Sequence, residues 1–249
     1  MDKKRSNRSI PEAIRNTLDR WLDPEKKTFL GIIGIQGDGK STWMKRIGKQ
    51  YSHIFSKGQL LDLDTIFEAT EGDDRTKRTA CVQAIRDCAQ RGSFVVELLP
   101  MHDMRSYISF LRQKGFQNLG ILYPMAGRRE ENIRRVLKRE GVELFSESEW
   151  SKWIRKVDIE ARKQYPNLLR SKELDFSLVI HNARYGEEKI LCEFHRGECR
   201  YQIQPFPEWA QQRLSPPSIR DRCWLALQKG LPQFPADVIF VLEKGRTKN

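Results

Sequence analysis

The chain has 249 residues, of which 39% are hydrophobic, and it carries a net charge of +12. This size fits one α/β domain with appended segments, and the composition excludes a disordered chain. The excess of Lys and Arg predicts a surface that attracts polyanions, so phosphorylated ligands and nucleic acid both fit as partners. There is no apolar run of the roughly 20 residues that a membrane span needs, and the first residues lack the apolar stretch expected of a signal peptide. The five cysteines are an odd number, so we expect reduced thiols and no disulfide framework. Together these features predict a cytoplasmic protein without a membrane partner.

The first part, residues 1–27, combines a basic segment with one amphipathic helix. We expect Ser9 to cap this helix and Pro24 to end its apolar pattern. From residue 28, apolar strands alternate with helices. Strands are predicted at 29–35, 60–63, 94–99, 119–123 and 176–181, and helices at 43–51, 75–90 and 104–114. Apolar strands separated by helices are typical of a parallel sheet covered on both faces.

After Asn182 the pattern changes to short strands with turn residues, which predicts an antiparallel β extension through 201–203 and a last strand at 238–242. The prediction is therefore an α/β fold in three parts. Residues 1–27 form an N-terminal segment, 28–185 a core with a five-stranded parallel sheet, and 186–249 a C-terminal extension. Cysteine and histidine also gather in this extension, but without the Cys-x-x-Cys pair of a zinc site. We interpret them as part of a reduced hairpin; they are Cys192, His195, Cys199 and Cys223.

A phosphate-binding motif follows the first strand. Residues 34–41 read Gly-Ile-Gln-Gly-Asp-Gly-Lys-Ser and satisfy G-x-x-x-x-G-K-[ST]. In this motif backbone amides wrap the phosphates, the lysine reaches the outer phosphates and the serine binds magnesium. An apolar strand before it and a helix after it make a glycine-rich turn without function a weaker alternative. We therefore expect ATP with Mg²⁺, contacted by Gly34, Gln36, Gly37, Asp38, Gly39, Lys40, Ser41 and Thr42.

Two side chains of this loop carry further expectations. Asp38 adds negative charge beside the phosphates, which is tolerable if its side chain points to solvent. Lys40 is expected at the surface, where it serves phosphate charge rather than packing. The chain lacks the Asn-Lys-x-Asp box of GTPases and the Leu-Ser-Gly-Gly-Gln signature of ABC ATPases, and strand 94–99 lacks the paired acids of motor ATPases. Of the protein classes that carry this phosphate-binding motif, the small kinases remain.

The segment Leu60-Leu61-Asp62-Leu63-Asp64 resembles the Asp-x-Asp segment of shikimate kinase and its gluconate kinase relatives. The resemblance implies that Asp62 helps to hold magnesium and that Asp64 holds the acceptor hydroxyl. At the end of a strand beside the phosphate loop, Asp64 can also accept the proton of that hydroxyl. The alternative for Asp64 is a helix N-cap.

Residues 127–139 resemble the arginine-bearing lid of nucleoside monophosphate kinases. The resemblance implies that Arg128, Arg129, Arg134 and Arg135 close on the transferring phosphoryl group, where cations supply much of the catalysis. The alternative is a solvated basic helix held by Glu130 to Arg134 and Glu131 to Arg135 pairs.

Residues 175–182 resemble a strand ending in guanylate kinase and its relatives, which implies base-side contacts for Asn182 and Arg184. Glu97 stands where a strand carboxylate could position magnesium through water, the alternative being a buried ion pair. The stretch between the second and third strands is too short for the monophosphate-binding domain of guanylate kinase, and the glycine triplet of shikimate kinase is absent. Neither family's acceptor can be carried over.

Three functions compete. A kinase for a small metabolite or nucleotide is favoured. A 5′-hydroxyl polynucleotide kinase, or another nucleic-acid-acting protein with this loop, is indicated by the charge of +12. Against it, Phe67 stands where the phage enzymes carry arginine. A protein that binds nucleotide without turning it over is the third.

Overall fold

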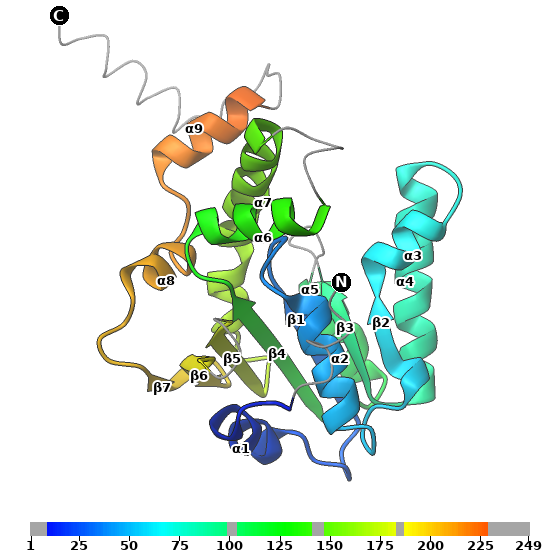
Figure 1. Ribbon diagram of the computed structural model, residues 1–249. Coiled ribbons are helices and arrows are strands. Elements are labelled where there is room, and N and C mark those ends of the chain that lie inside the picture. Colours follow the sequence, from blue (N-terminus) through cyan, green and yellow to red (C-terminus); the bar gives the residue numbers. More distant parts are fainter. Residues whose placement is uncertain (1–8, 99–103, 141–146, 183–186, 229–249) are drawn as a thin grey trace, which may run out of the picture.

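The fold is an α/β arrangement around one seven-stranded sheet with the order β2-β3-β1-β4-β5-β6-β7 (Figure 1). The computed structural model describes residues 9–98, 104–140, 147–182 and 187–228. The strands are β1 Thr28–Ile33, β2 Leu60–Asp62, β3 Phe94–Leu98, β4 Asn118–Met125, β5 Phe176–His181, β6 Lys189–His195 and β7 Glu198–Gln202. Strands β2, β3, β1, β4 and β5 pair in parallel, and β6 and β7 join β5 in antiparallel pairs. The parallel part is as predicted, but the sheet does not stop at five strands, because the antiparallel strands continue it.

Nine α-helices lie within the described part of the chain. They are α1 Glu12–Trp21, α2 Lys40–Gln50, α3 Leu63–Ala69, α4 Asp74–Arg91, α5 Met104–Gln113, α6 Arg129–Glu140, α7 Glu147–Leu169, α8 Glu208–Arg213 and α9 Ile219–Gln228. The last three were not predicted, and α3 was implied only by the N-cap alternative for Asp64. None of the described helices combines the length and apolar character that crossing a membrane requires.

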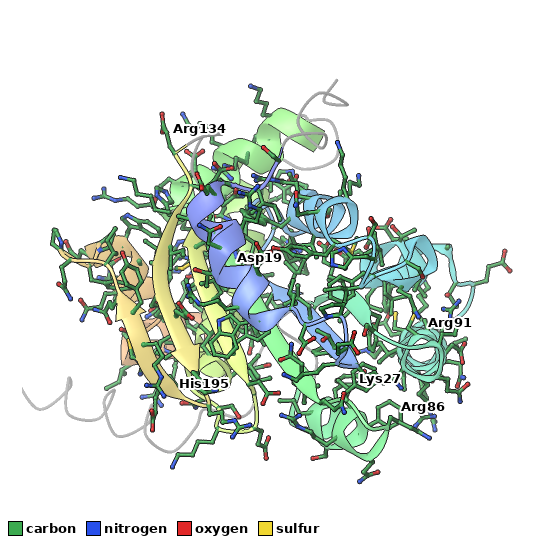
Figure 2. All side chains as sticks on the ribbon, turned by 90° about the horizontal axis from the view of Figure 1, so that it is seen from below. Asp19, Lys27, Arg86, Arg91, Arg134 and His195 are labelled. Carbon is green, nitrogen blue, oxygen red and sulfur yellow. The ribbon has the colours of Figure 1, made fainter. Side chains whose placement is uncertain are left out.

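Two apolar clusters cover the two faces of the sheet. On one face α1 and α2 pack on the strands through side chains such as Leu18 and Trp43, both fully buried. Figure 2 shows α1 lying across this face. On the other face α4, α5 and α7 pack through residues such as Ile85, Leu111 and Ile154. The successive residues of buried strands alternate between these clusters, as expected for a sheet covered on both sides.

Helix α1 differs from its prediction at the start. Its N-cap is Pro11, which makes no side-chain capping bond, so the expected Ser9 cap is wrong. The helix is instead held at its other end, where Arg20 and the indole N–H of Trp21 both donate to the carboxylate of Glu193 in β6. The predicted strand 238–242 and residue Arg184 lie outside the described residues.

Candidate functional site

The phosphate loop connects β1 to α2 at the edge where the parallel strands end. Gly39 is the N-cap of α2 with a φ of 92°, so the helix begins at Lys40 and its first amides have no partner within the helix. Gly37 has a φ of 85°, and a Cβ atom there would lie 2.8 Å from the carbonyl oxygen of Asn132. Both positions therefore need glycine. The loop and the helix N-terminus have the form that binds phosphate groups.

Lys40 and Glu97 form a buried ion pair at the start of α2. Nζ of Lys40 lies 3.4 Å from Oε1 of Glu97, and each side chain is 5% exposed. The expectation of a surface lysine is wrong, since β3 runs beside β1 and brings Glu97 under the loop. The buried ion pair that stood as the alternative for Glu97 is present, and its role toward magnesium stays a prediction. Burial raises the pKa of Glu97, although Lys40 and a hydrogen bond with Ser41 act against this rise.

One carboxylate oxygen of Glu97 is left without a hydrogen bond from the described residues. This atom, Oε2, is buried. Ser41 lies beside it and bonds the same carboxylate. Magnesium takes oxygen ligands and keeps several waters next to substrate phosphates, so a hydroxyl and a carboxylate here fit that ion. Within the described ranges, no three His, Cys, Asp or Glu side chains gather as an all-protein metal site.

Asp62 and Asp64 lie at the adjacent end of β2. Oδ1 of Asp62 accepts the backbone N–H groups of Asp64 and Thr65 at 3.1 and 3.2 Å, so Asp62 is the N-cap of α3. The alternative that gave this capping role to Asp64 is therefore wrong. Asp64 lies in the first turn of α3 and is partly buried. Asp62 pairs with Glu97 in the strand register, and both aspartates raise the pKa of Glu97, so they lie near enough to interact with it electrostatically.

Asp38 does not point to solvent, which corrects the expectation. It is fully buried, and its two carboxylate oxygens accept hydrogen bonds from Nη1 and Nη2 of Arg213 at 2.9 and 2.8 Å. The backbone N–H of Ala126 and the side-chain amide of Asn132 also donate to Oδ1, each at 2.9 Å. The N–H of Ile35 donates to Oδ2 at 2.8 Å. The negative charge inside the loop is thus fully paired.

The four arginines of the expected lid divide into two groups: Arg129 and Arg135 are partly buried, whereas Arg128 and Arg134 are exposed. Arg135 donates to the carbonyl oxygen of Asn182 at 2.7 Å and to that of Gly37 at 3.4 Å, so it lies against the phosphate loop. Arg128 is exposed, and the Arg134 side chain is 74% exposed. Figure 2 shows Arg134 at the edge of the molecule.

The expected ion pairs of α6 are confirmed in part. Glu131 pairs with Arg135 as predicted, at 3.0 Å. Arg134 pairs with Glu131 instead of Glu130. The helix is also fixed to the loop from within, because the buried Asn132 donates to the carbonyl oxygen of Gln36 at 2.8 Å. This part of α6 is docked on the loop (Figure 1).

Asn182 follows β5 and touches the loop directly. Its side-chain amide donates to the carbonyl oxygen of Asp38, and its Oδ1 accepts the indole N–H of Trp43 at 3.3 Å. Two further residues of the loop's surroundings were not predicted. Tyr165 of α7 accepts the N–H of Gly34 at 3.2 Å, and Arg213 of α8 pairs with Asp38 across 175 sequence positions. The only sequence signal for Arg213 was the acid Asp38 inside the loop. A buried acid needs a cation, but the sequence does not identify the residue that supplies it.

The fold and the loop together define a protein with an α/β architecture and a P-loop between β1 and α2. No protein-family model and no curated protein sequence matches the chain. A solved complex of AvrRxo1-ORF1 and ORF2 with ATP matches at a TM-score of 0.50 and 13% identity, over 81% of this chain and 68% of that chain.

Two further solved structures match with lower scores. The PezAT toxin-antitoxin system of Streptococcus pneumoniae matches at a TM-score of 0.42 and 15% identity, over 94% of this chain and 92% of that chain. A gluconokinase from Sinorhizobium meliloti 1021 matches at 0.35 and 18%, over 53% and 74%. At these identities the likeness concerns the fold.

Proposed function

We propose that the protein is an ATP-dependent phosphotransferase that moves the γ-phosphate of Mg-ATP to a hydroxyl or phosphate group of a small metabolite or nucleotide. One observation carries this proposal. The buried Lys40 and Glu97 pair lies at the N-terminus of α2, near Asp62 at the end of β2 and Asp64 in the first turn of α3. Phosphoryl transfer needs positive charge on the phosphates and a carboxylate for the acceptor, and this arrangement supplies both.

The phosphates would bind to the loop amides and to Lys40. Ser41 and Glu97 would hold magnesium, the serine directly and the glutamate through water, and the ion supplies positive charge to the phosphate oxygens. The unpaired Oε2 atom of Glu97, within the described residues, supports this role. Lys40 would then exchange its contact with Glu97 for one with the outer phosphates. Asp62, whose Oδ1 is fixed by two backbone N–H groups, would line the same site.

Asp64 would orient the acceptor. It lies in the first turn of α3, near enough to Glu97 to raise the pKa of that residue. A carboxylate in this position can accept the proton of a hydroxyl as that hydroxyl attacks the γ-phosphate. Its N-cap alternative is removed, since Asp62 fills that place.

Arg135 would supply the lid cation, because it already lies against Gly37 and Asn182. Arg128 and Arg134 are exposed and would need the helix to move before they reach a phosphate. Asn182 contacts the loop from the β5 side, which agrees with a place near the nucleotide base. We keep it as the base-side residue of this proposal.

Labelled ATP tests the proposal. The purified chain is incubated with [γ-³²P]ATP, Mg²⁺ and a panel of metabolites, nucleotides and oligonucleotides, in parallel with Asp64→Asn. A kinase gives a labelled product that the variant does not form. ATP binding without transfer or hydrolysis would instead indicate a nucleotide binder without turnover.

A salt series separates the acceptor classes. If an oligonucleotide is labelled, its affinity should fall steeply between about 50 and 200 mM salt, because Lys and Arg contacts release counterions. Binding of a small metabolite should change little over the same range. A steep fall would move the assignment to the polynucleotide kinase alternative, which the net charge of +12 first suggested.

A further inference from the structure

Arg213 reaches the phosphate loop from a different part of the chain. It is the last residue of α8, in the C-terminal part, and its side chain is 5% exposed. Helix α8 belongs to the C-terminal part of the chain, far from α2 in the sequence (Figure 1). Its guanidinium makes a two-point contact with Asp38, at 2.9 and 2.8 Å. A planar guanidinium that holds a carboxylate by two bonds fixes orientation as well as charge.

The surroundings hold this guanidinium in place. Arg213 also donates to the hydroxyl of Tyr123 at 3.0 Å and to the carbonyl oxygen of Gly127 at 3.3 Å. Its Nε atom lies 3.6 Å from the carboxylate of Asp158, a buried residue of α7. Arg213 therefore joins β4, α7 and α8 to one residue of the loop.

The position of Asp38 makes this contact matter for the loop. Asp38 stands between Gly37 and Gly39, both of which have positive φ values. Glycine restrains its own backbone weakly, so the side chain of Asp38 is the anchor of this stretch. The bonds that it accepts from Ile35 and Ala126 tie the loop to its own start and to the end of β4.

The charge of Asp38 is a second reason why its contact with Arg213 matters for the loop. An unpaired carboxylate inside the loop would repel the phosphates that the loop amides and Lys40 attract. Arg213 neutralises it within hydrogen-bond distance, and a buried charge that loses its partner is strongly unfavourable.

We propose that Arg213 is a positioning residue of the nucleotide site, which sets the phosphate-binding conformation of the loop through Asp38. On this reading α8 is a part of the site and not an accessory segment. The part of this inference that concerns ATP binding rests on the proposed function. The effect of Arg213 on the conformation of the loop does not depend on that function.

The test compares Arg213→Met with Arg46→Met. Arg46 pairs with Glu188 at 2.9 Å, both side chains being 3% exposed, and its guanidinium lies over the ring of Trp43, so it offers a buried ion pair outside residues 34–42. Three quantities are measured on each protein: the melting temperature, the hydrogen exchange of loop amides 34–42, and the dissociation constant of Mg-ATP by titration calorimetry. Both variants should melt at lower temperature than the wild type.

Only Arg213→Met should change the loop. We expect its loop amides to exchange about tenfold faster, and Mg-ATP to bind about tenfold more weakly, because affinity falls with the fraction of chains whose loop is competent. Arg213→Lys keeps the charge but loses the two-point contact. Its loop exchange and its Mg-ATP affinity should lie between those of Arg213→Met and the wild type. Arg46→Met should leave both quantities at the wild-type value.

The outcomes separate the two claims. If Arg213→Met folds and shows wild-type loop exchange and affinity, Arg213 is a packing residue and the inference is wrong. If it does not fold, Arg213→Lys and the charge-free pair Asp38→Asn with Arg213→Met decide the question by the same readouts. If the wild type does not bind Mg-ATP, the proposed function fails, while loop exchange still decides the role of Arg213.

Discussion

Glu97 in β3 lies opposite Ile32 in β1 and places its carboxylate 3.4 Å from Nζ of Lys40. The lysine of the phosphate loop is therefore held by a buried acid of the next strand. Burial raises the pKa of this acid, with Lys40 acting in the opposite direction. This relationship changes what a substitution of the lysine should do.

Lys40→Ala should destabilise the fold as well as disturb the site, because it leaves Glu97 buried without its cation. Loss of one partner of a buried pair typically costs about 3–5 kcal/mol, less here to the extent that Glu97 takes up a proton. The double substitution Lys40→Met with Glu97→Gln removes both charges and should recover most of that loss. Urea unfolding of the three proteins measures it, and equal stability of wild type and Lys40→Ala would argue against the pair.

Arg135→Ala should lower kcat, whereas Arg134→Ala should not. Arg135 lies against the loop through Gly37 and Asn182, while Arg134 is 74% exposed and makes a surface pair. Surface pairs contribute about 0–1 kcal/mol, so Arg134→Ala serves as the matched control on the same helix. Steady-state kinetics on the labelled acceptor decide it. Equal losses in the two variants would mean that α6 moves as a lid and brings both arginines to the phosphates.

Asp64→Asn should lower phosphoryl transfer by about 10²–10⁴-fold, because it keeps the shape of the side chain but removes the base. Asp62→Asn provides the contrast for stability, since asparagine is as good an N-cap as aspartate. Asp62→Ala should cost about 0.5–2 kcal/mol for the lost cap of α3. Transfer at the wild-type rate in Asp64→Asn would exclude it as the base.

The ion pair of Asp38 predicts a pH dependence of stability. Burial acts to raise the pKa of Asp38, but Arg213 and the hydrogen bonds from Ala126 and Asn132 outweigh it and hold the pKa below the ordinary value of 3.8. A lowered folded pKa means that this stabilisation is present above 3.8 and is lost as the pH falls through the folded value.

The difference in unfolding free energy between wild type and Asp38→Asn should therefore be constant from neutral pH to about pH 5 and shrink below pH 4. Asp158 contributes to the pH dependence of stability with the opposite sign, since burial raises its pKa. Because Asp158 is present in both proteins, the difference between wild type and Asp38→Asn limits this contribution. Urea unfolding across this range measures the difference. A difference that does not change down to pH 2 would contradict the ion pair.

Much of the fold could be predicted because strong local patterns carry it. Strand β5 was predicted at its observed bounds, and α4 ends at Gly92 as expected. The helices α7, α8 and α9 were missed. Pro166 interrupts the helical pattern of α7, and prolines flank α8. Proline disfavours a helix in sequence-based prediction, whereas tertiary packing stabilises these helices in the fold.

The site could be predicted only where contacts are local in sequence. The loop motif, the strand acid Glu97 and the two aspartates after β2 follow from spacing along single elements. The partner of Asp38 does not, because 175 positions separate it from Arg213 and nothing in the sequence pairs them. Burial also changed two expectations: Lys40 and Asp38 are inside because α6, α8 and β3 close over the loop, and single elements do not reveal that closure.

Titration calorimetry of Mg-ATP against the wild type and against Lys40→Met with Glu97→Gln tests the central claim most directly. The double substitution removes the loop lysine without leaving a buried charge, so a loss of binding cannot be ascribed to an unpaired Glu97. We predict one Mg-ATP per wild-type chain and affinity reduced by about tenfold or more in the variant, since the lysine contacts charged phosphates. A folded variant that binds Mg-ATP as tightly as the wild type, or a wild type that does not bind it, would contradict the account.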